Sequence, residues 1–118
     1  MIKDYSDLQV WQLGRQIVKD IYTVTSIFPD SEKYGLVSQM RRAAVSIPSN
    51  IAEGFNRRNQ KEYRQFLFVA LGSCAELSTQ ATLSSDLGFL DHIQLQKFDD
   101  EIRKLSKMLM SLTQKLVV

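Results

Sequence analysis

Apolar residues recur three and four residues apart through most of this chain, and this spacing restricts it to helices. The clearest example is a strict 3-4-3-4-3-4 order in the last quarter: Leu95, Phe98, Ile102, Leu105, Leu109, Leu112 and Leu116. Such an order places all seven side chains on one side of a helix as a heptad seam. No segment shows the sustained period-two alternation of a half-buried strand. The chain is therefore predicted to be all-α.

Capping and breaking residues divide this pattern into four helices. They are predicted at about residues 7–28, 31–54, 60–87 and 92–117. Ser6 is expected to open the first helix through a capping box, and Pro29 to end it. Gly54 is expected to end the second helix, since glycine adopts the left-handed conformation without strain. Asn59 and Asp91 are expected to cap the third and fourth helices.

Pro48 lies inside the second predicted helix. It removes a backbone hydrogen bond at a cost of about 3 kcal/mol if nothing compensates. A kinked helix is expected near Pro48, with a break into two helices as the alternative. Because the four helices are joined by short loops, they must fold back on one another. The prediction is a single up-down-up-down four-helix bundle over residues 1–118.

Bulk properties restrict the kind of protein further. The chain has 118 residues, enough for one core, and a net charge of +2. Its single cysteine excludes an internal disulfide and a multi-cysteine metal site. No secretory signal is recognisable at its start, so a cytoplasmic protein is expected. We expect no cofactor, no metal and no small-molecule substrate.

The third predicted helix is apolar on every side around residues 66–71. This run of six residues is far below the ~20 needed to span a bilayer, so no membrane partner is expected. A bundle helix needs one apolar stripe, and the surplus face must be covered. We expect a second copy of the chain to cover it, with Phe66, Phe68 and Val69 at the interface. The alternative is a monomer in which this helix lies unusually centrally.

Catalytic constellations are nearly absent. His92 is the only histidine and lies in a predicted first turn, where a solvated role is expected. Cys74 has no basic neighbour to lower its pKa, so we interpret it as a packing residue. Glu53 and Glu76 lie on different predicted helices and could face each other, but a carboxylate pair is weak evidence for a site. The chain is predicted not to be an enzyme.

Four polar residues share one face of the second predicted helix. Arg42, Ser46, Asn50 and Glu53 are spaced four, four and three residues apart. They favour an internal network, joined by Glu76 from the third helix, because buried charges are tolerated only when paired. The alternative is a polar ribbon that faces a ligand.

The strongest functional signal is a basic segment. Residues 41–64 hold six basic and two acidic side chains, a net +4, whereas the other 94 residues hold nine basic and eleven acidic. The candidate nucleic-acid-binding residues are Arg41, Arg57, Arg58, Lys61 and Arg64. Tyr63 and Phe55 lie nearby for base stacking, and cations beside a helix start suit phosphate contact. A merely solvated basic loop is the alternative.

The chain resembles the four-helix bundle proteins of the 23S ribosomal RNA intervening-sequence family. The matching stretches are Y-x-x-T-x-x-F-P at residues 22–29, Y-G-L at residues 34–36 and Q-M-R-R-A-A-V-S-I-P-S-N-I-A-E-G-F at residues 39–55. Trp11 also matches, as do Gly72-Ser73 and Glu76-Leu77.

This resemblance implies a homopentameric ring without established enzymatic activity. A related protein, the accessory variability determinant of diversity-generating retroelements, is a basic pentamer that binds nucleic acid. The expected partners are therefore further copies of the chain and RNA or DNA. The alternative is an adaptor that scaffolds a protein partner.

Overall fold

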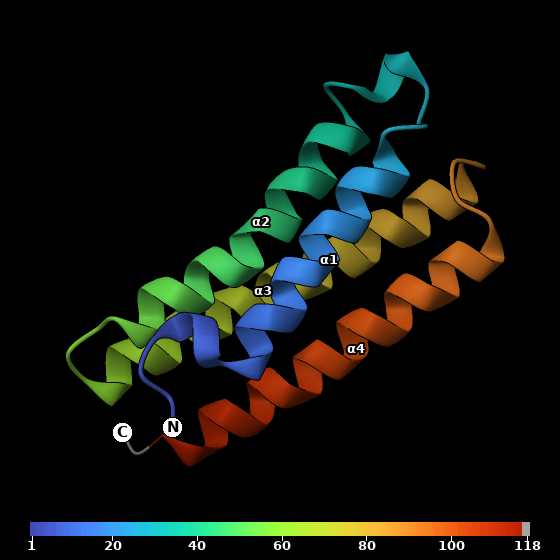
Figure 1. Cartoon of the computed structure of the whole chain (residues 1–118). Helices are drawn as coiled ribbons and strands as arrows, with labels where there is room; N and C mark the ends of the chain where they lie inside the picture. The colour runs from blue at the N-terminus through green and yellow to red at the C-terminus, as the bar shows by residue number, and fades with distance from the viewer. Residues whose placement is uncertain (117–118) are drawn as a thin grey trace.

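A computed structural model describes residues 1–116 as four α-helices and two short 3-10 helices, with no strand among them. The elements follow in the order η1 (Tyr5–Asp7), α1 (Gln9–Thr25), η2 (Asp30–Glu32), α2 (Leu36–Phe55), α3 (Gln60–Asp86) and α4 (His92–Lys115). The four α-helices run side by side and alternate in direction, so both termini lie at one end (Figure 1). The predicted all-α up-down-up-down bundle is confirmed. Residue 117, the expected last residue of the fourth helix, lies outside the described residues.

The helices form a four-cornered bundle of 44 × 23 × 22 Å. Each helix contacts the two that precede and follow it, with α4 returning to α1, and no diagonal pair of described helices makes backbone contact. The closest association is between α2 and α3, and the loosest is between α1 and α4. Small residues explain the close pair, because Ala43, Ala44 and Ala70 are buried and let the backbones approach.

Large aliphatic side chains fill the centre. The largest fully buried ones are Ile17, Ile21, Met40, Ile47, Ile51, Leu67, Leu77, Leu105 and Leu109. Each such side chain stabilises the fold by about 1.5–3 kcal/mol relative to exposure. The predicted heptad seam of α4 points inward: its central members are buried, and Leu95, Leu112 and Leu116 pack partly buried against the core.

The first helix starts later than the predicted residue 7, and Ser6 does not cap it. Asp4 caps η1 instead, accepting hydrogen bonds from the Ser6 hydroxyl at 2.6 Å and the Ser6 amide at 3.4 Å. The Asp7 carboxylate accepts in return from the Asp4 amide at 3.1 Å. This earlier capping box forms a 3-10 turn and leaves α1 to begin at Gln9 without a side-chain cap.

The junction between the first two helices is also longer than predicted. The first helix ends at Thr25 rather than residue 28, and the second begins at Leu36 rather than residue 31. Residues 30–32 form the 3-10 turn η2, in which the Glu32 amide donates to the Pro29 carbonyl at 2.9 Å. Because this turn satisfies the local backbone groups, the α-helix starts only after Gly35.

Gly54 does not end the second helix, and the prediction of a left-handed stop there is wrong. The helix continues to Phe55, and Gly54 has no positive φ. A Cβ at Gly54 would lie 2.7 Å from the Cβ of Phe66, so glycine is required by the close approach of α3. The left-handed stop occurs after α3, at Gly88, with φ +84°.

Helix α2 runs through Pro48 without interruption, which excludes the alternative of two separate helices. The bend near Pro48 stays a prediction. Gly14 of α1 lies against this proline, since a Cβ there would be 3.6 Å from both Cβ and Cδ of Pro48. Gly14 and Pro48 therefore lie where α1 and α2 approach each other closely.

Candidate nucleic-acid interface

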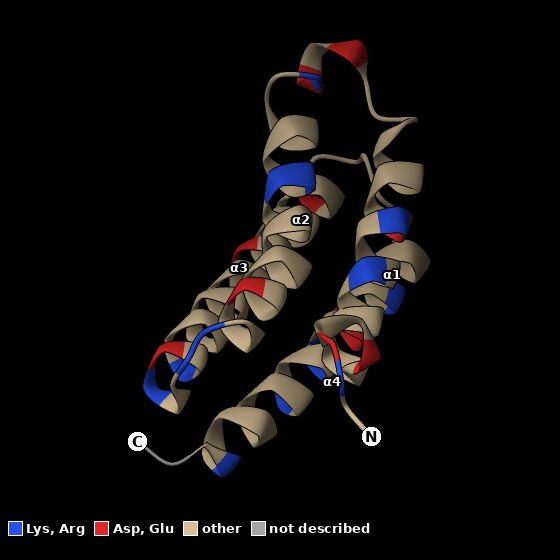
Figure 2. Cartoon of the chain, turned by 60° about the vertical axis from the view of Figure 1, so that its left-hand side comes forward, with Lys and Arg blue, Asp and Glu red and all other residues tan. Residues whose placement is uncertain are grey.

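Four cations gather where α2 ends and α3 begins. We name Arg57, Arg58, Lys61 and Arg64 the basic turn. Figure 2 shows blue segments where α2 and α3 are joined, at the end of the bundle that also carries the termini. The Asn59 side chain caps α3 by accepting from the Glu62 amide at 2.9 Å, as predicted. This cap fixes the path of the chain between the two arginines and Lys61.

Phenylalanine rings hold two of these arginines in place. The Cζ atom of Arg57 lies 4.7 Å from the Phe66 ring centre, and that of Arg64 lies 5.4 Å from the Phe68 ring centre. Arg57 also approaches the Glu53 carboxylate, with Nη2 and Oε1 3.7 Å apart. Cation–π contact at such distances restricts the guanidinium groups without using their N–H donors. Those donors suit phosphate oxygens, except the Nε of Arg64, which is buried and makes no hydrogen bond within the described residues.

The rings of Phe55 and Tyr63 pack on each other instead of standing free. Their centres are 6.0 Å apart in an edge-to-face arrangement, and both residues are half-buried. Burial raises the pKa of the Tyr63 hydroxyl. Stacking of bases on these two rings would require them to separate, so the geometry favours phosphate contact over base contact here.

Arg41 lies apart from the basic turn. Arg41 precedes Phe55, the last residue of α2, by fourteen residues, which corresponds to about 21 Å along the helix axis, and Arg57 follows beyond that end. Its Cζ atom is 4.4 Å from the Tyr22 ring centre, and its Nε donates to the Thr25 hydroxyl at 3.0 Å. The structure therefore places one of the five candidate nucleic-acid residues on a different surface.

The internal polar network is smaller than predicted. The hydroxyls of Ser46 and Ser73 lie 2.8 Å apart across α2 and α3, and Asn50 donates to the Ser46 hydroxyl at 2.9 Å. Arg42, Glu53 and Glu76 are exposed in the described chain and do not join this network. Glu53 pairs with Arg57 on its own helix. The two serines and Asn50 thus hydrogen-bond one another between α2 and α3. Arg42, Glu53 and Glu76 remain in water.

The predicted apolar surplus of α3 is partly exposed. Phe68 and Val69 are 44% and 51% exposed, whereas Phe66 is half-buried beneath Arg57. By length and composition, α3 is also the one described helix that could cross a membrane. The same helix supplies Leu67 and Leu77 to the bundle core, as a core helix does. The absence of a membrane partner stays a prediction.

The residues weighed for catalysis lie apart from one another. His92 is exposed at the start of α4. Cys74 is buried, and this burial raises the pKa of its thiol despite a hydrogen bond from Ser106. Within residues 1–116, no group of three or more histidine, cysteine or acidic side chains is placed to hold a metal ion.

Comparison with known families identifies the family of this chain. Residues 6–111 match the family described as 23S rRNA-intervening sequence protein. The chain belongs to this family. None of the individually curated proteins matches it.

One solved structure supports the family fold. It is a crystal structure, at 1.70 Å resolution, of a protein of unknown function from the S23 ribosomal protein family of Bacteroides thetaiotaomicron VPI-5482. The two chains are 18% identical and superpose with a TM-score of 0.84. The match covers 90% of this chain and 96% of the other. At this identity, the likeness shows the fold.

Two interactions of this family member could not be found from sequence spacing. One joins Arg41 to Tyr22 and Thr25 across α1 and α2. The other sets Glu101 of α4 against Asp20 of α1. Burial, and then the negative charge of Asp20, raises the pKa of the Glu101 carboxyl, while Lys97 opposes the shift. Both depend on which helix faces overlap, and helical periodicity does not specify that.

Proposed function

We propose that this family member is a non-catalytic homo-oligomer, a pentamer, that binds RNA or DNA through the basic turn. The observation that carries the proposal is the concentration of four cations on one helix junction, two of them positioned over phenylalanine rings. A ring would repeat this positive surface in each subunit and strengthen its field. Contacts of this kind would bind mainly phosphates and would not read base sequence.

Three features support a role without catalysis. The lone histidine is exposed, the lone cysteine is buried with a raised thiol pKa, and Tyr63 is half-buried with a raised hydroxyl pKa. The thiol and the phenol are therefore poorly suited to act as a nucleophile or general base near neutral pH, and the histidine lies on a different helix from both. We retain the cytoplasmic location as a prediction.

The test is titration of a labelled single-stranded RNA at two salt concentrations. Four phosphate contacts should weaken binding about 50-fold between about 50 and about 200 mM salt. A variant with Arg57, Arg58, Lys61 and Arg64 replaced by glutamine should lose most of the affinity and most of the salt dependence. Negligible binding by the unaltered protein at both salt concentrations contradicts the proposal.

A matched variant controls for net charge. It replaces four exposed lysines outside the basic turn by glutamine: Lys19, Lys104, Lys107 and Lys115. The loss of formal charge is the same in both variants, so a local site predicts a large effect only for the basic-turn variant. Equal losses would indicate that the total charge, rather than this turn, binds the nucleic acid.

The second candidate is an adaptor that scaffolds a protein partner. It is favoured by the exposed apolar side chains of Phe68, Val69 and Leu83 on α3. The basic-turn variant separates the two functions, because an adaptor should keep its partner in a pull-down when the four cations are replaced. RNA binding would then be absent in the unaltered protein as well.

A further inference from the structure

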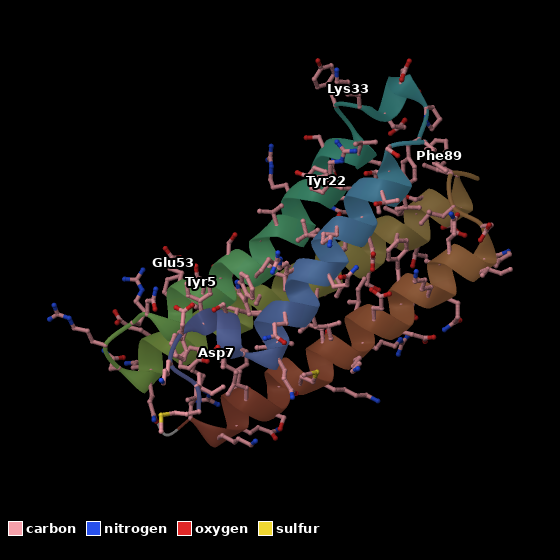
Figure 3. All side chains as sticks on the ribbon, in the orientation of Figure 1. Tyr5, Asp7, Tyr22, Lys33, Glu53 and Phe89 are labelled. Atoms are coloured by element: carbon pink, nitrogen blue, oxygen red, sulfur yellow. The ribbon has the colours of Figure 1, made fainter. Side chains whose placement is uncertain are left out.

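An open groove lies at the opposite end of α2 from the basic turn. It has a volume of about 480 Å³, and its lining includes Tyr22, Lys33, Tyr34, Arg41, Arg42 and Val45. Three of these side chains are cationic, and no acidic residue of the described chain lines the groove. Figure 3 shows Tyr22 and Lys33 at this end of the bundle, far from Glu53 beside the basic turn. The groove is therefore a second positive surface.

Arg41 is held in the groove by one edge of its guanidinium group. Its Nε donates to the Thr25 hydroxyl at 3.0 Å, and its Nη2 reaches the Tyr22 carbonyl at 3.4 Å. The Tyr22 ring supports the flat face, with Cζ 4.4 Å from the ring centre. The opposite edge, which includes Nη1, makes no hydrogen bond within the described residues. A fixed guanidinium with one free edge suits bidentate contact with an oxyanion.

Aromatic rings and further cations line the same groove. Tyr34 is 87% exposed, and the Lys33 ammonium nitrogen lies 5.6 Å from its ring centre. Arg42 is exposed and makes no ion pair within the described residues. Exposed tyrosine rings provide surfaces on which a planar base can stack, at about 1–3 kcal/mol per base. A carboxylate ligand would use the cations but not the rings.

We infer that this groove binds a nucleotide unit, with its phosphate on Arg41 and Arg42 and its base against Tyr34. The groove volume lies within the range of small-ligand sites, about 300–1,000 Å³. The unit can be a free nucleoside monophosphate or one nucleotide of a single strand, since both present the same phosphate and base. This site does not depend on the basic turn and stands whether or not that turn binds nucleic acid.

Calorimetric titration of the full chain with four probes tests the inference. The probes are inorganic phosphate, adenosine monophosphate, a five-nucleotide single-stranded RNA and a polyglutamate peptide. Adenosine monophosphate or the RNA should bind at least about tenfold more tightly than phosphate, because only they add stacking. Binding of the monophosphate identifies a free nucleotide as the source, and binding of the RNA alone identifies a strand. Phosphate or polyglutamate binding as tightly as both nucleotide probes overturns the inference.

Variants locate the site. Arg42→Gln should weaken nucleotide binding by about tenfold, as expected when a hydrogen bond to a charged group is lost, and Arg41→Gln by at least as much. Tyr34→Ala should reduce the affinity of adenosine monophosphate toward that of phosphate. Because Arg41 also joins α1 to α2, the exposed Arg42 and Tyr34 keep the test valid if Arg41→Gln unfolds.

Lys104→Gln is the matched control and should leave binding of adenosine monophosphate within about twofold, since this exposed lysine lies on α4, which makes no backbone contact with α2. An equal loss in Lys104→Gln would assign the binding to the total positive charge and overturn the groove site. Light scattering adds a further condition. A change of oligomeric mass in Arg42→Gln would show that the groove is an interface between copies of the chain, which also overturns the inference.

Discussion

Two helical glycines lie in opposite surroundings, one crowded and one open. Gly54 is buried against α3, where a Cβ would lie 2.7 Å from the Phe66 Cβ and 3.1 Å from Cδ1 of Tyr63. Gly72 lies in the interior of α3 with no heavy atom within 4 Å of the position a Cβ would take. The same substitution should therefore have opposite effects at the two positions.

We expect Gly54→Ala to destabilise the fold. Overpacking between α2 and α3 costs about 1–3 kcal/mol, which exceeds the gain of up to about 1 kcal/mol from the higher helix propensity of alanine. The measurement is the free energy of unfolding from urea titration. An unchanged or higher free energy would show that the two helices can separate slightly at no cost.

We expect Gly72→Ala to stabilise the protein by up to about 1 kcal/mol, because alanine loses less backbone entropy in a helix and meets no neighbour here. The same urea titration measures it, and the Gly54 variant provides the comparison. A loss of stability would contradict the open surroundings of Gly72 and would indicate that another copy covers this face of α3.

Glu101 gives a pH-dependent prediction. Its pKa is raised in the folded state by burial and by Asp20, so the folded protein binds this proton more tightly than the unfolded chain. Its contribution to stability is complete below the unfolded pKa near 4.5 and is lost as pH rises through the folded pKa. Glutamine cannot ionise, so Glu101→Gln removes the stability loss that ionisation of Glu101 causes as pH rises. It should stabilise the protein at pH 7 by less than about 1 kcal/mol, the scale of a partly exposed charge pair.

Urea titrations of Glu101→Gln at pH 7 and pH 4 check this expectation. The difference from the unaltered protein should shrink at pH 4, where the glutamic acid is itself neutral. Lys97→Gln is the control with the opposite sign, because Lys97 lowers the pKa of Glu101. Removal of this cation should therefore make the stability fall further between pH 4 and pH 7. A Glu101→Gln effect of the same size at both pH values would show that packing, and not charge, is responsible.

At the scale of helices, the starts and ends that depend on one local signal could be predicted from the sequence. Asn59 and Asp91 cap α3 and α4 as expected. The start of α1 could not be predicted in this way, because Asp4 forms an earlier capping box with Asp7 and accepts a hydrogen bond from the Ser6 hydroxyl. The role of Gly54 depended on the distance to another helix, and no local pattern records such a distance.

The α4 cap provides the prediction for this scale. The Asp91 carboxylate accepts from the Gln94 amide at 2.7 Å, and the Gln94 side chain accepts from the Asp91 amide at 3.2 Å. Asp91→Ala should lower the free energy of unfolding by about 1 kcal/mol, the usual cost of losing an N-cap. Asp86→Ala is the control and should be neutral or stabilising, since a carboxylate in the last turn of α3 opposes the helix dipole. Equal losses in both variants would contradict a specific capping role.

At the scale of the whole molecule, the basic turn was predictable and the Arg41 groove was not. The four cations of the turn lie within eight consecutive residues, so sequence distance already brings them together. Tyr22 and Arg41 meet only because α1 and α2 pack with particular faces. The same dependence on facing surfaces left Arg42, Glu53 and Glu76 exposed, although helical spacing had favoured an internal network. Which residues share a surface can therefore be told only once the packing of the helices is known. The fold class follows from the spacing of the apolar residues alone.

The exposed apolar side chains of α3 lead to a prediction about assembly. A chain of 13.6 kDa that forms the proposed pentamer should show about five times this mass in light scattering, or about 68 kDa. Phe68→Gln combined with Val69→Gln should lower this mass, because the two side chains are 44% and 51% exposed in the single chain and would be buried in the ring. Burying an apolar surface of this kind contributes about 25 cal/mol per Å².

Ile93→Gln is the control, since Ile93 is 83% exposed at the start of α4 and lies on a different helix. A mass of 13.6 kDa for the unaltered protein would contradict the ring, and an equal decrease in the control would contradict an interface on α3.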